Sequence, residues 1–361
     1  KHGIKLVLGY TVEGFKEKDN GVEVLLKDNP SLQADMVVLA IGVTPDTVLA
    51  KEAGLELGIK ESIVVNDRME TSVPDIYAAG DAVQVKHYVT GNDALISLAG
   101  PANKQGRIIA DNICGGDSRY LGSQGSSVIK VFDMTAATTG INETNAKKSG
   151  LEVDTVILSP MSHAGYYPGG KVMTMKVVFE KETYRLLGAQ IIGYEGVDKR
   201  IDVLATAIHA GLNATQLKDL DLAYAPPYSS AKDPVNMAGF MIDNIAKGTL
   251  KQWHLEDMDK ISKDKDVELL DVRTVGEFSR GHIDGFKNIP VDELRERISE
   301  IEKGKPVYLI CQSGLRSYIA SRILEGNGYE TYNFSGGFRF YDAVVNDRAL
   351  IERAYACGMD Y

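Results

Sequence analysis

A cysteine followed by a short polar loop stands near the end of the chain, where its thiol could carry out sulfur chemistry. The apolar segment 307–310 leads directly to Cys311, the loop 312–316 follows, and a helical pattern begins at about residue 317. Ligands of open α/β sheets bind at the carboxyl ends of strands, and amides at the start of a helix stabilise negative charge. The loop therefore favours Cys311 as a thiolate, and Arg316 adds a positive charge. The alternative interpretation is a buried structural cysteine at a strand end.

The segments around this loop favour a reactive Cys311 over a structural one. They are Leu270-Asp271-Val272-Arg273, Glu277-Phe278, Gly281-His282-Ile283, Asn288-Ile289-Pro290, the loop Cys311 to Ser317, and Ser335-Gly336-Gly337. Together they resemble the signature of the rhodanese domain over about residues 255–345. The resemblance implies that Cys311 accepts a sulfane sulfur as a persulfide and passes it to a thiol. The C-x4-R spacing from Cys311 to Arg316 is one residue shorter than that of the related phosphatase loops, so sulfur transfer is favoured over phosphatase chemistry.

Three polar residues near the loop are interpreted as structural. His282 is expected to be a structural residue at the start of a strand rather than a general base. Asp271 and Arg273 are expected to form an internal polar pair or to support loops.

A second group of residues, early in the chain, has the pattern of a nucleotide site. The segment 71–81 ends in Gly80 and Asp81, where a glycine lets a cofactor approach and a carboxylate accepts hydrogen bonds from ribityl or ribose hydroxyls. With residues 40–45 and 95–107, it resembles the late flavin-binding region of the pyridine nucleotide-disulfide oxidoreductases, a resemblance that covers residues 1–245. It implies cofactor contacts at Gly80, Asp81, Pro101, Ala102 and Asn103.

Other features of that family do not occur in the chain. There is no G-x-G-x-x-G phosphate loop, and none of Cys114, Cys311 and Cys357 matches the context of the family's redox cysteine. The family places both phosphate loops and this cysteine upstream. We therefore expect the chain to be the C-terminal part of a longer enzyme, whose preceding part is required for full binding of FAD, NAD(P)H and coenzyme A. Cys114, at a helix end, is interpreted as structural.

The combination with a rhodanese domain resembles the coenzyme A-disulfide reductase family in its rhodanese-fused form, which includes NADH-dependent persulfide and polysulfide reductases. Related enzymes use a histidine to assist the leaving thiol, but residues 223–234 contain none, and phenol hydroxyls could donate instead. The resemblance implies two tyrosines supplied by the partner subunit, with Tyr166 and Tyr224 the best matches. The nearby competitors are Tyr167 and Tyr228. Asn103 and Lys232 match coenzyme A contacts, and ordinary interface packing is the alternative for each.

The elements that position these residues divide the chain into four parts. Residues 1–45 and 46–120 are expected to be the C-terminal parts of the NAD(P)-binding and FAD-binding domains, as remnants of two Rossmann-like folds. Residues 121–246 are expected to form an α+β dimerisation domain and residues 255–361 a small α/β rhodanese domain. The fold class is thus α/β and α+β multidomain, and we expect a homodimer.

Hydrophobic patterning predicts the individual elements. Strands are expected over residues 4–8, 21–26, 35–42 and 76–81, and a hairpin over 172–179 and 186–192. A helix is expected over 201–210. The last part is expected to contain strands 267–270, 307–310 and 330–334, with a helix over 317–324. The runs 35–42 and 76–81 are continuous and end in glycine, as buried parallel strands do.

Composition excludes several other classes of protein. The formal net charge of −10 argues against nucleic-acid binding, and 44% hydrophobic residues exclude intrinsic disorder. The sequence has neither an apolar run of about 18 residues for a membrane span nor the apolar core of a signal peptide. Three scattered cysteines are too few for a disulfide framework or a zinc site, so a cytoplasmic, reducing location and no metal are expected.

Two functions follow from these patterns. The first is a flavin-dependent NAD(P)H:disulfide or persulfide oxidoreductase acting on coenzyme A disulfide, coenzyme A persulfide or polysulfide, with sulfane sulfur delivered through Cys311. The second is a redox-inactive dimeric fragment with only rhodanese sulfurtransferase or sulfur-binding activity. A phosphate loop and a redox cysteine encoded upstream of Lys1 would favour the first.

Overall fold

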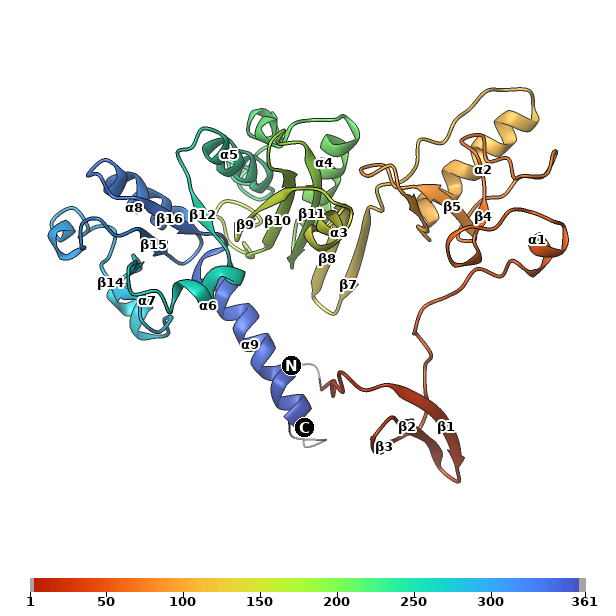
Figure 1. Cartoon of the computed structure of the whole chain (residues 1–361), viewed down its shortest axis with the longest axis horizontal. Coiled ribbons are helices and arrows are strands. Elements are labelled where there is room, and N and C mark those ends of the chain that lie inside the picture. The colour runs from red at the N-terminus through yellow and green to blue at the C-terminus, as the bar shows by residue number, and fades with distance from the viewer. Residues whose placement is uncertain (1–2, 357–361) are drawn as a thin grey trace. The chain divides into compact units, whose positions relative to one another are not determined.

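The computed structural model of the chain describes residues 3–356, with side chains to residue 347, so Cys357 lies outside the described residues. The chain divides into two units, one formed by the residues up to 43 with those from 341 on, and one formed by residues 44–340. Figure 1 shows the elements of both units. In the part of the chain that the structure describes, no helix is long and apolar enough to cross a membrane.

The first unit contains a small antiparallel sheet. Its strands are β1 (Val12–Lys18), β2 (Gly21–Leu26) and β3 (Asn29–Ala34), in the order β1-β2-β3. The strand predicted over 21–26 is therefore confirmed. The strands predicted over 4–8 and 35–42 are wrong, because both segments are irregular and Ile41 is 91% exposed. A buried parallel strand needs hydrogen-bonded neighbours, and no described strand pairs with residues 35–42.

Residues 44–120 form a small sheet covered by one long helix. The elements are α1 (Val48–Glu52), β4 (Ile63–Val64), β5 (Val83–Lys86), β6 (Asp93–Ala94) and α2 (Ala99–Ile113). Ile108 and Ile109 of α2 pack on a core of Met69, Val83 and Val85. The strand predicted over 76–81 is wrong, since that segment is a loop in which only Tyr77 forms an isolated bridge, to Glu70.

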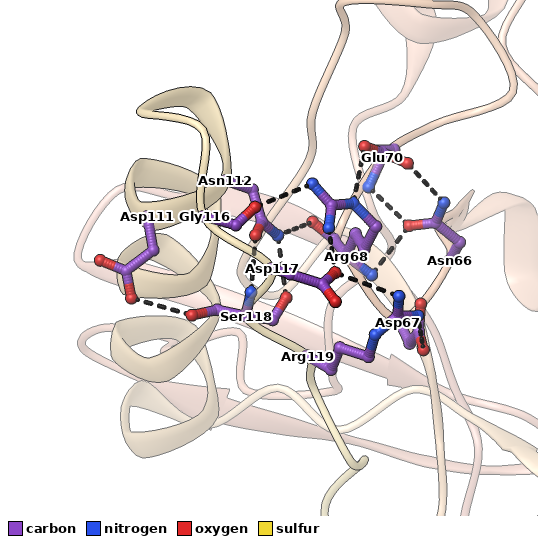
Figure 2. Close-up of polar contacts among 10 residues, drawn as sticks. All are labelled: Asn66, Asp67, Arg68, Glu70, Asp111, Asn112, Gly116, Asp117, Ser118 and Arg119. Carbon is purple, nitrogen blue, oxygen red and sulfur yellow. Dashed lines mark hydrogen bonds and ion pairs between the residues drawn. The ribbon is translucent and has the colours of Figure 1, made fainter.

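A polar cluster fixes the C-terminal end of α2 to the segment 66–70 (Figure 2). The Asn112 side chain donates to the carbonyls of Arg68 and Ser118, at 3.1 and 2.9 Å, and accepts from the Ser118 amide. Arg68 pairs with Glu70 and Asp117 and also donates to the Gly116 carbonyl. The contacts of Arg68 with Asn112, Gly116 and Asp117 span more than 40 residues of sequence, so they set the position of the helix against this segment.

The third part is an antiparallel sheet of order β7-β8-β11-β10-β9 with helices packed on it. The strands are β7 (Ser127–Val131), β8 (Met134–Gly140), β9 (Val153–Leu158), β10 (Thr174–Glu180) and β11 (Leu186–Gly193). The helices are α3 (Glu143–Lys148), α4 (Val197–His209) on β8 and β11, and α5 (Pro234–Ala246) on β9. The predicted hairpin is confirmed, and the predicted helix begins earlier than expected, at Val197.

The last part is a parallel sheet of order β12-β16-β15-β13-β14. The strands are β12 (Gln252–Trp253), β13 (Glu268–Asp271), β14 (Lys287–Asn288), β15 (Val307–Ile310) and β16 (Thr331–Phe334). The helices are α6 (Met258–Ile261), α7 (Val275–Ser279), α8 (Leu315–Glu325) and α9 (Gly337–Ala356). Short 3₁₀ helices occur at Ile59–Glu61, Ala214–Asp219, Leu255–Asp257 and Ile298–Glu300. The predicted α/β and α+β class is confirmed, whereas the exact domain boundaries remain a prediction.

A buried ion pair organises the start of α5. The Arg200 and Asp233 side chains are 1% and 3% exposed, and Nη2 of Arg200 lies 2.9 Å from Oδ2 of Asp233. Arg200 also donates to the Ser162 carbonyl and the Ser229 hydroxyl, and Asp233 accepts from the Val235 amide as the N-cap of α5. This pair therefore connects α4, α5 and the loop 223–232 between them.

We expect Asp233→Asn to lower the free energy of unfolding by about 3–5 kcal/mol, because it leaves the Arg200 guanidinium buried without a counter-charge. The matched control is Asp243→Asn, which removes an ion pair to Lys218 and Lys247 near the surface and should cost about 1 kcal/mol or less. Urea unfolding followed by circular dichroism measures both variants. Equal losses in the two variants would show that the buried pair has no special role.

Candidate active site

Cys311 lies at the carboxyl end of β15, as predicted, and its thiol is enclosed by the loop that follows. The residue is fully buried, and its Sγ accepts hydrogen bonds from the Gly314 amide at 3.1 Å and the Ser317 hydroxyl at 3.2 Å. Gly314 is the N-cap of α8 and has a φ of 101°. Two donors from the start of a helix thus face the sulfur, an arrangement that stabilises a thiolate.

The loop is fixed from behind by the turn that follows β16. The Cys311 and Gln312 carbonyls accept from the Phe338 and Arg339 amides, and Asn333 donates to the Gly314 carbonyl at 3.1 Å. A Cβ atom at Gly337 would lie only 2.6 Å from the Ser313 amide nitrogen, so glycine is required for this close approach. The late glycine turn therefore sets the shape of the cysteine loop.

Arg316 does not present a free charge to Cys311. Its guanidinium binds the Glu277 carboxylate through two hydrogen bonds of 2.7 Å, and the hydrogen bonds to Arg316 help to lower the pKa of Glu277 to about 2. The same carboxylate accepts from the Thr274 amide and hydroxyl at the start of α7. The sequence did not assign Glu277 a role, although the Thr274-x-x-Glu277 spacing is that of a capping box and could have placed it at a helix start.

The predicted internal pair of Asp271 and Arg273 is confirmed. Both residues are buried, with Arg273 Nη2 2.7 Å from Asp271 Oδ2, and the guanidinium stacks on the Phe338 ring at 3.8 Å. His282 lies in the turn after α7 rather than at the start of a strand. Its ring stacks on Phe278, and Nδ1 lies 3.1 Å from the carbonyl oxygen of that residue, so its expected structural role fits but its expected position was wrong.

A crevice of about 420 Å³ opens beside the cysteine loop. One wall is the loop 313–315 with Tyr318 and Asn333, and the opposite wall comes from residues 158–160 and α5 with Lys232. Two buried polar atoms in this lining, Ser159 Oγ and Asn333 Oδ1, have no hydrogen-bond partner. Lys232 thus adds an ammonium group to a largely apolar lining. Sequence reasoning missed both polar residues, because they come from separate domains.

The two predicted tyrosines lie side by side. Their hydroxyl oxygens are 2.7 Å apart, and the hydrogen bond to Tyr166 raises the pKa of Tyr224 above its usual value. Tyr224 lines a pocket of about 570 Å³ together with His163, Lys199 and Tyr228. Tyr167 instead packs edge-on against His163. Because its pKa is raised, Tyr224 remains protonated at neutral pH.

The predicted flavin contacts occupy two neighbouring elements. The Gly80 amide donates to Gln105 of α2 at 2.7 Å, and no heavy atom lies within 4 Å of the position that a Cβ of Gly80 would take. Asp81 is exposed, and the first turn of α2, with Pro101, Ala102 and Asn103, has no side-chain cap. An open glycine, an exposed carboxylate and uncapped amides fit one wall of a site for FAD.

Cys114 stands at a helix end, as expected, and its structural role stays a prediction. It is the exposed C-cap residue of α2, and its thiol is free. Among residues 3–347, no cluster of three or more His, Cys, Asp or Glu side chains could hold a metal ion.

Three stretches of the chain match family models. Residues 1–106 match the pyridine nucleotide-disulphide oxidoreductase model, residues 126–234 match the dimerisation domain of that family, and residues 254–343 match the rhodanese-like domain. The curated protein "NAD(P)H sulfur oxidoreductase (CoA-dependent)" of Pyrococcus abyssi is 37% identical over 235 residues, 65% of this chain and 52% of that protein.

Two solved structures are similar over most of the chain. The reduced CoADR-RHD of Bacillus anthracis has a TM-score of 0.90 and 46% identity, over 94% of this chain and 60% of that one. The NAD-dependent persulfide reductase from A. fulgidus has a TM-score of 0.83 and 40% identity, over 92% and 61%. The chain spans about half the length of the curated relatives it matches.

The ion pair between Glu277 and Arg316 predicts a pH dependence of stability. Because the Glu277 pKa is lowered from 4.5 to about 2 in the folded chain, its contribution is present above pH 4.5 and is lost as the pH falls towards 2. We expect Glu277→Gln to cost about 1–2 kcal/mol at pH 6, after solvent screening, and almost nothing near pH 2. Urea unfolding at both pH values measures the difference, and a cost that does not change with pH would contradict the assignment.

Proposed function

The chain belongs to the pyridine nucleotide-disulphide oxidoreductase family and carries a rhodanese-like domain. We propose that it transfers sulfane sulfur through Cys311 to a flavin-dependent reductase site. The proposed reaction of the whole protein is NAD(P)H-dependent reduction of coenzyme A disulfide, coenzyme A persulfide or polysulfide. The single observation that carries the proposal is the geometry at Cys311, a buried sulfur that accepts two hydrogen bonds at the start of α8.

The chemistry at Cys311 is a thiolate displacement. The Cys311 thiolate attacks the outer sulfur of a persulfide R–S–SH, the S–S bond of the donor breaks, and R–S⁻ leaves with the bonding electron pair. The product is a persulfide on Cys311, and the reverse displacement by an acceptor thiol regenerates the thiolate. The Gly314 amide and the Ser317 hydroxyl stabilise the charged form of the sulfur before and after transfer.

The crevice beside the loop is the proposed route for the acceptor. It joins Lys232, which corresponds to a coenzyme A contact in the resemblance, to the cysteine loop at residues 313–315. Lys232 would bind a phosphate of the carrier, and the apolar lining of the crevice would pack against its chain.

The proposed redox site uses Tyr224 and Tyr166 as hydroxyl donors. A thiolate leaving from a disulfide develops negative charge, and a phenol at about 3 Å stabilises it more than it stabilises the neutral disulfide. Tyr166 is 76% exposed and Tyr224 45% exposed, so both are accessible to groups outside this chain. FAD, held in part by Gly80, Asp81 and the first turn of α2, would supply electron transfer from NAD(P)H to the disulfide, and Asn103 would contact coenzyme A.

We also propose a homodimer in a reducing, cytoplasmic environment. The hairpin β7–β8 exposes Val128, Ile129, Val131 and Phe132, each at least half exposed, within the segment that matches the dimerisation domain. An exposed apolar row of this size is typical of a surface that another protein covers. A partner subunit that contributes Tyr166 and Tyr224 to the flavin site would make the dimer necessary for reduction.

We expect Cys311→Ser to abolish sulfur transfer while it leaves the fold intact, because a hydroxyl oxygen cannot carry a sulfane sulfur. Thiocyanate production from thiosulfate and cyanide measures transfer, and thermal melting measures the fold. Cys114→Ser is the matched control and should retain full transfer. Unchanged thiocyanate production in Cys311→Ser would end the assignment of sulfur transfer to this residue.

We expect Tyr224→Phe to slow the disulfide half-reaction of the FAD-loaded protein by about 10²-fold or more, because one donor to the leaving thiolate is lost. Flavin content and the flavin reduction rate with NADH should stay close to wild type, and Tyr228→Phe should affect neither half-reaction. Stopped-flow absorbance separates the two steps. If the NADH step slowed and the disulfide step did not, Tyr224 would position the flavin instead.

A further inference from the structure

Two arginine side chains near Cys311 are each paired with a carboxylate. Arg316 in the loop is neutralised by Glu277 through two hydrogen bonds of 2.7 Å, and Arg273 is neutralised by Asp271. The sulfur itself accepts its hydrogen bonds from an uncharged amide and a hydroxyl. The loop therefore supplies dipoles to the thiolate, while its own guanidinium is paired with the Glu277 carboxylate.

The position of Glu277 does not depend on Arg316 alone. Its carboxylate also accepts from the Thr274 amide at 3.0 Å and hydroxyl at 2.9 Å, and its amide donates back to the Thr274 hydroxyl in a capping box. The Glu277 and Arg316 side chains are 23% and 31% exposed, so water screens the pair only in part. The start of α7 thus holds a carboxylate against the loop cation.

We propose that Glu277 is a specificity-determining residue, which by neutralising Arg316 makes the Cys311 loop select sulfur donors of low charge over dianionic donors such as thiosulfate. This inference rests on the proposed sulfur transfer at Cys311. The favoured donors are those in which the part that enters the loop carries little negative charge. A hydropersulfide of an uncharged thiol belongs to the favoured class.

The two classes of donor differ in the charge that the loop must hold. With thiosulfate, the Cys311 thiolate attacks the outer sulfur, the S–S bond breaks, and sulfite leaves as a dianion with the bonding electrons. With a hydropersulfide R–S–SH, the same attack releases R–S⁻, which carries one negative charge. A loop whose cation is already paired stabilises the departing dianion poorly, because the Glu277 carboxylate repels it.

The test compares Glu277→Gln, Arg316→Gln and the double variant with the wild-type chain. Glutamine keeps the capping box, since Gln serves as well as Glu at that position, so Glu277→Gln removes the charge while the helix start is preserved. The double variant removes both charges and restores neutrality. Thermal melting checks that each variant folds.

The first readout is the local charge, measured without any sulfur transfer. Cys311 is alkylated with anionic iodoacetate and with neutral iodoacetamide, and the rate ratio is determined for each cysteine by mass spectrometry. We expect the iodoacetate to iodoacetamide ratio to rise about tenfold in Glu277→Gln, to fall in Arg316→Gln and to return to the wild-type value in the double variant. The exposed Cys114 is the internal control, and its ratio should not change.

The second readout is specificity, as the ratio of kcat/KM for thiosulfate to kcat/KM for the hydropersulfide of N-acetylcysteamine. We expect this ratio to rise about tenfold in Glu277→Gln and to return towards wild type in the double variant. An unchanged or lower ratio in Glu277→Gln would overturn the proposal. If the wild-type chain formed no persulfide on Cys311 with either donor, the proposed function would fail, and the alkylation ratios would still decide whether Glu277 sets the charge of the loop.

Discussion

The close contact between the glycine turn after β16 and the cysteine loop is the constraint on which the site depends. Since a side chain at Gly337 would collide with the Ser313 amide nitrogen, the two backbones can meet only because glycine stands there. Their contact lets the Phe338 and Arg339 amides hold the Cys311 and Gln312 carbonyls. With its carbonyls held from behind, the loop can point the Gly314 amide at the sulfur. Loop amides oriented in advance stabilise charge without having to reorganise when it forms.

Arginine in this chain serves to fix geometry more than to supply free charge. Arg200, Arg273 and Arg316 are each paired with a carboxylate, and the first two are almost completely buried. Burial of an unpaired guanidinium would cost several kcal/mol, so each buried arginine requires a carboxylate partner. Arg200 also donates to three backbone carbonyls, and Arg273 to one. Arg200 in this way holds the loop 223–232 that carries Tyr224, and Arg273 holds the turn at Gly281. The positions of both candidate sites thus depend on ion pairs outside the reacting groups.

The sequence predicted those features that depend on local pattern. The alternating hairpin over residues 172–192, the strand that leads to Cys311 and the pair of Asp271 and Arg273 all follow from neighbouring residues. The strands predicted over 35–42 and 76–81 were wrong because the formation of a buried strand depends on its neighbours in the sheet, which a hydrophobic run cannot specify. Glu277 and Asn333 were missed for a related reason. Their contacts to the loop span 39 and 19 residues, and only the folded sheet brings them together.

The junction between the antiparallel sheet and the rhodanese-like domain fixes the two walls of the crevice beside the Cys311 loop. The Ile157 amide of β9 donates to Ser335 at 3.1 Å, Gln252 donates to the Thr155 carbonyl, and His254 lies 3.1 Å from Asp154. Beside these contacts, the buried Trp253 of β12 holds the connecting segment in the last sheet, where its ring centroid lies 4.5 Å from that of Phe334. Hydrogen bonds from three residues across one junction oppose rotation of the domain about its linker. The loop and the crevice therefore keep a fixed relation to Lys232, and in the proposed transfer the acceptor thiol would approach the Cys311 loop along this crevice.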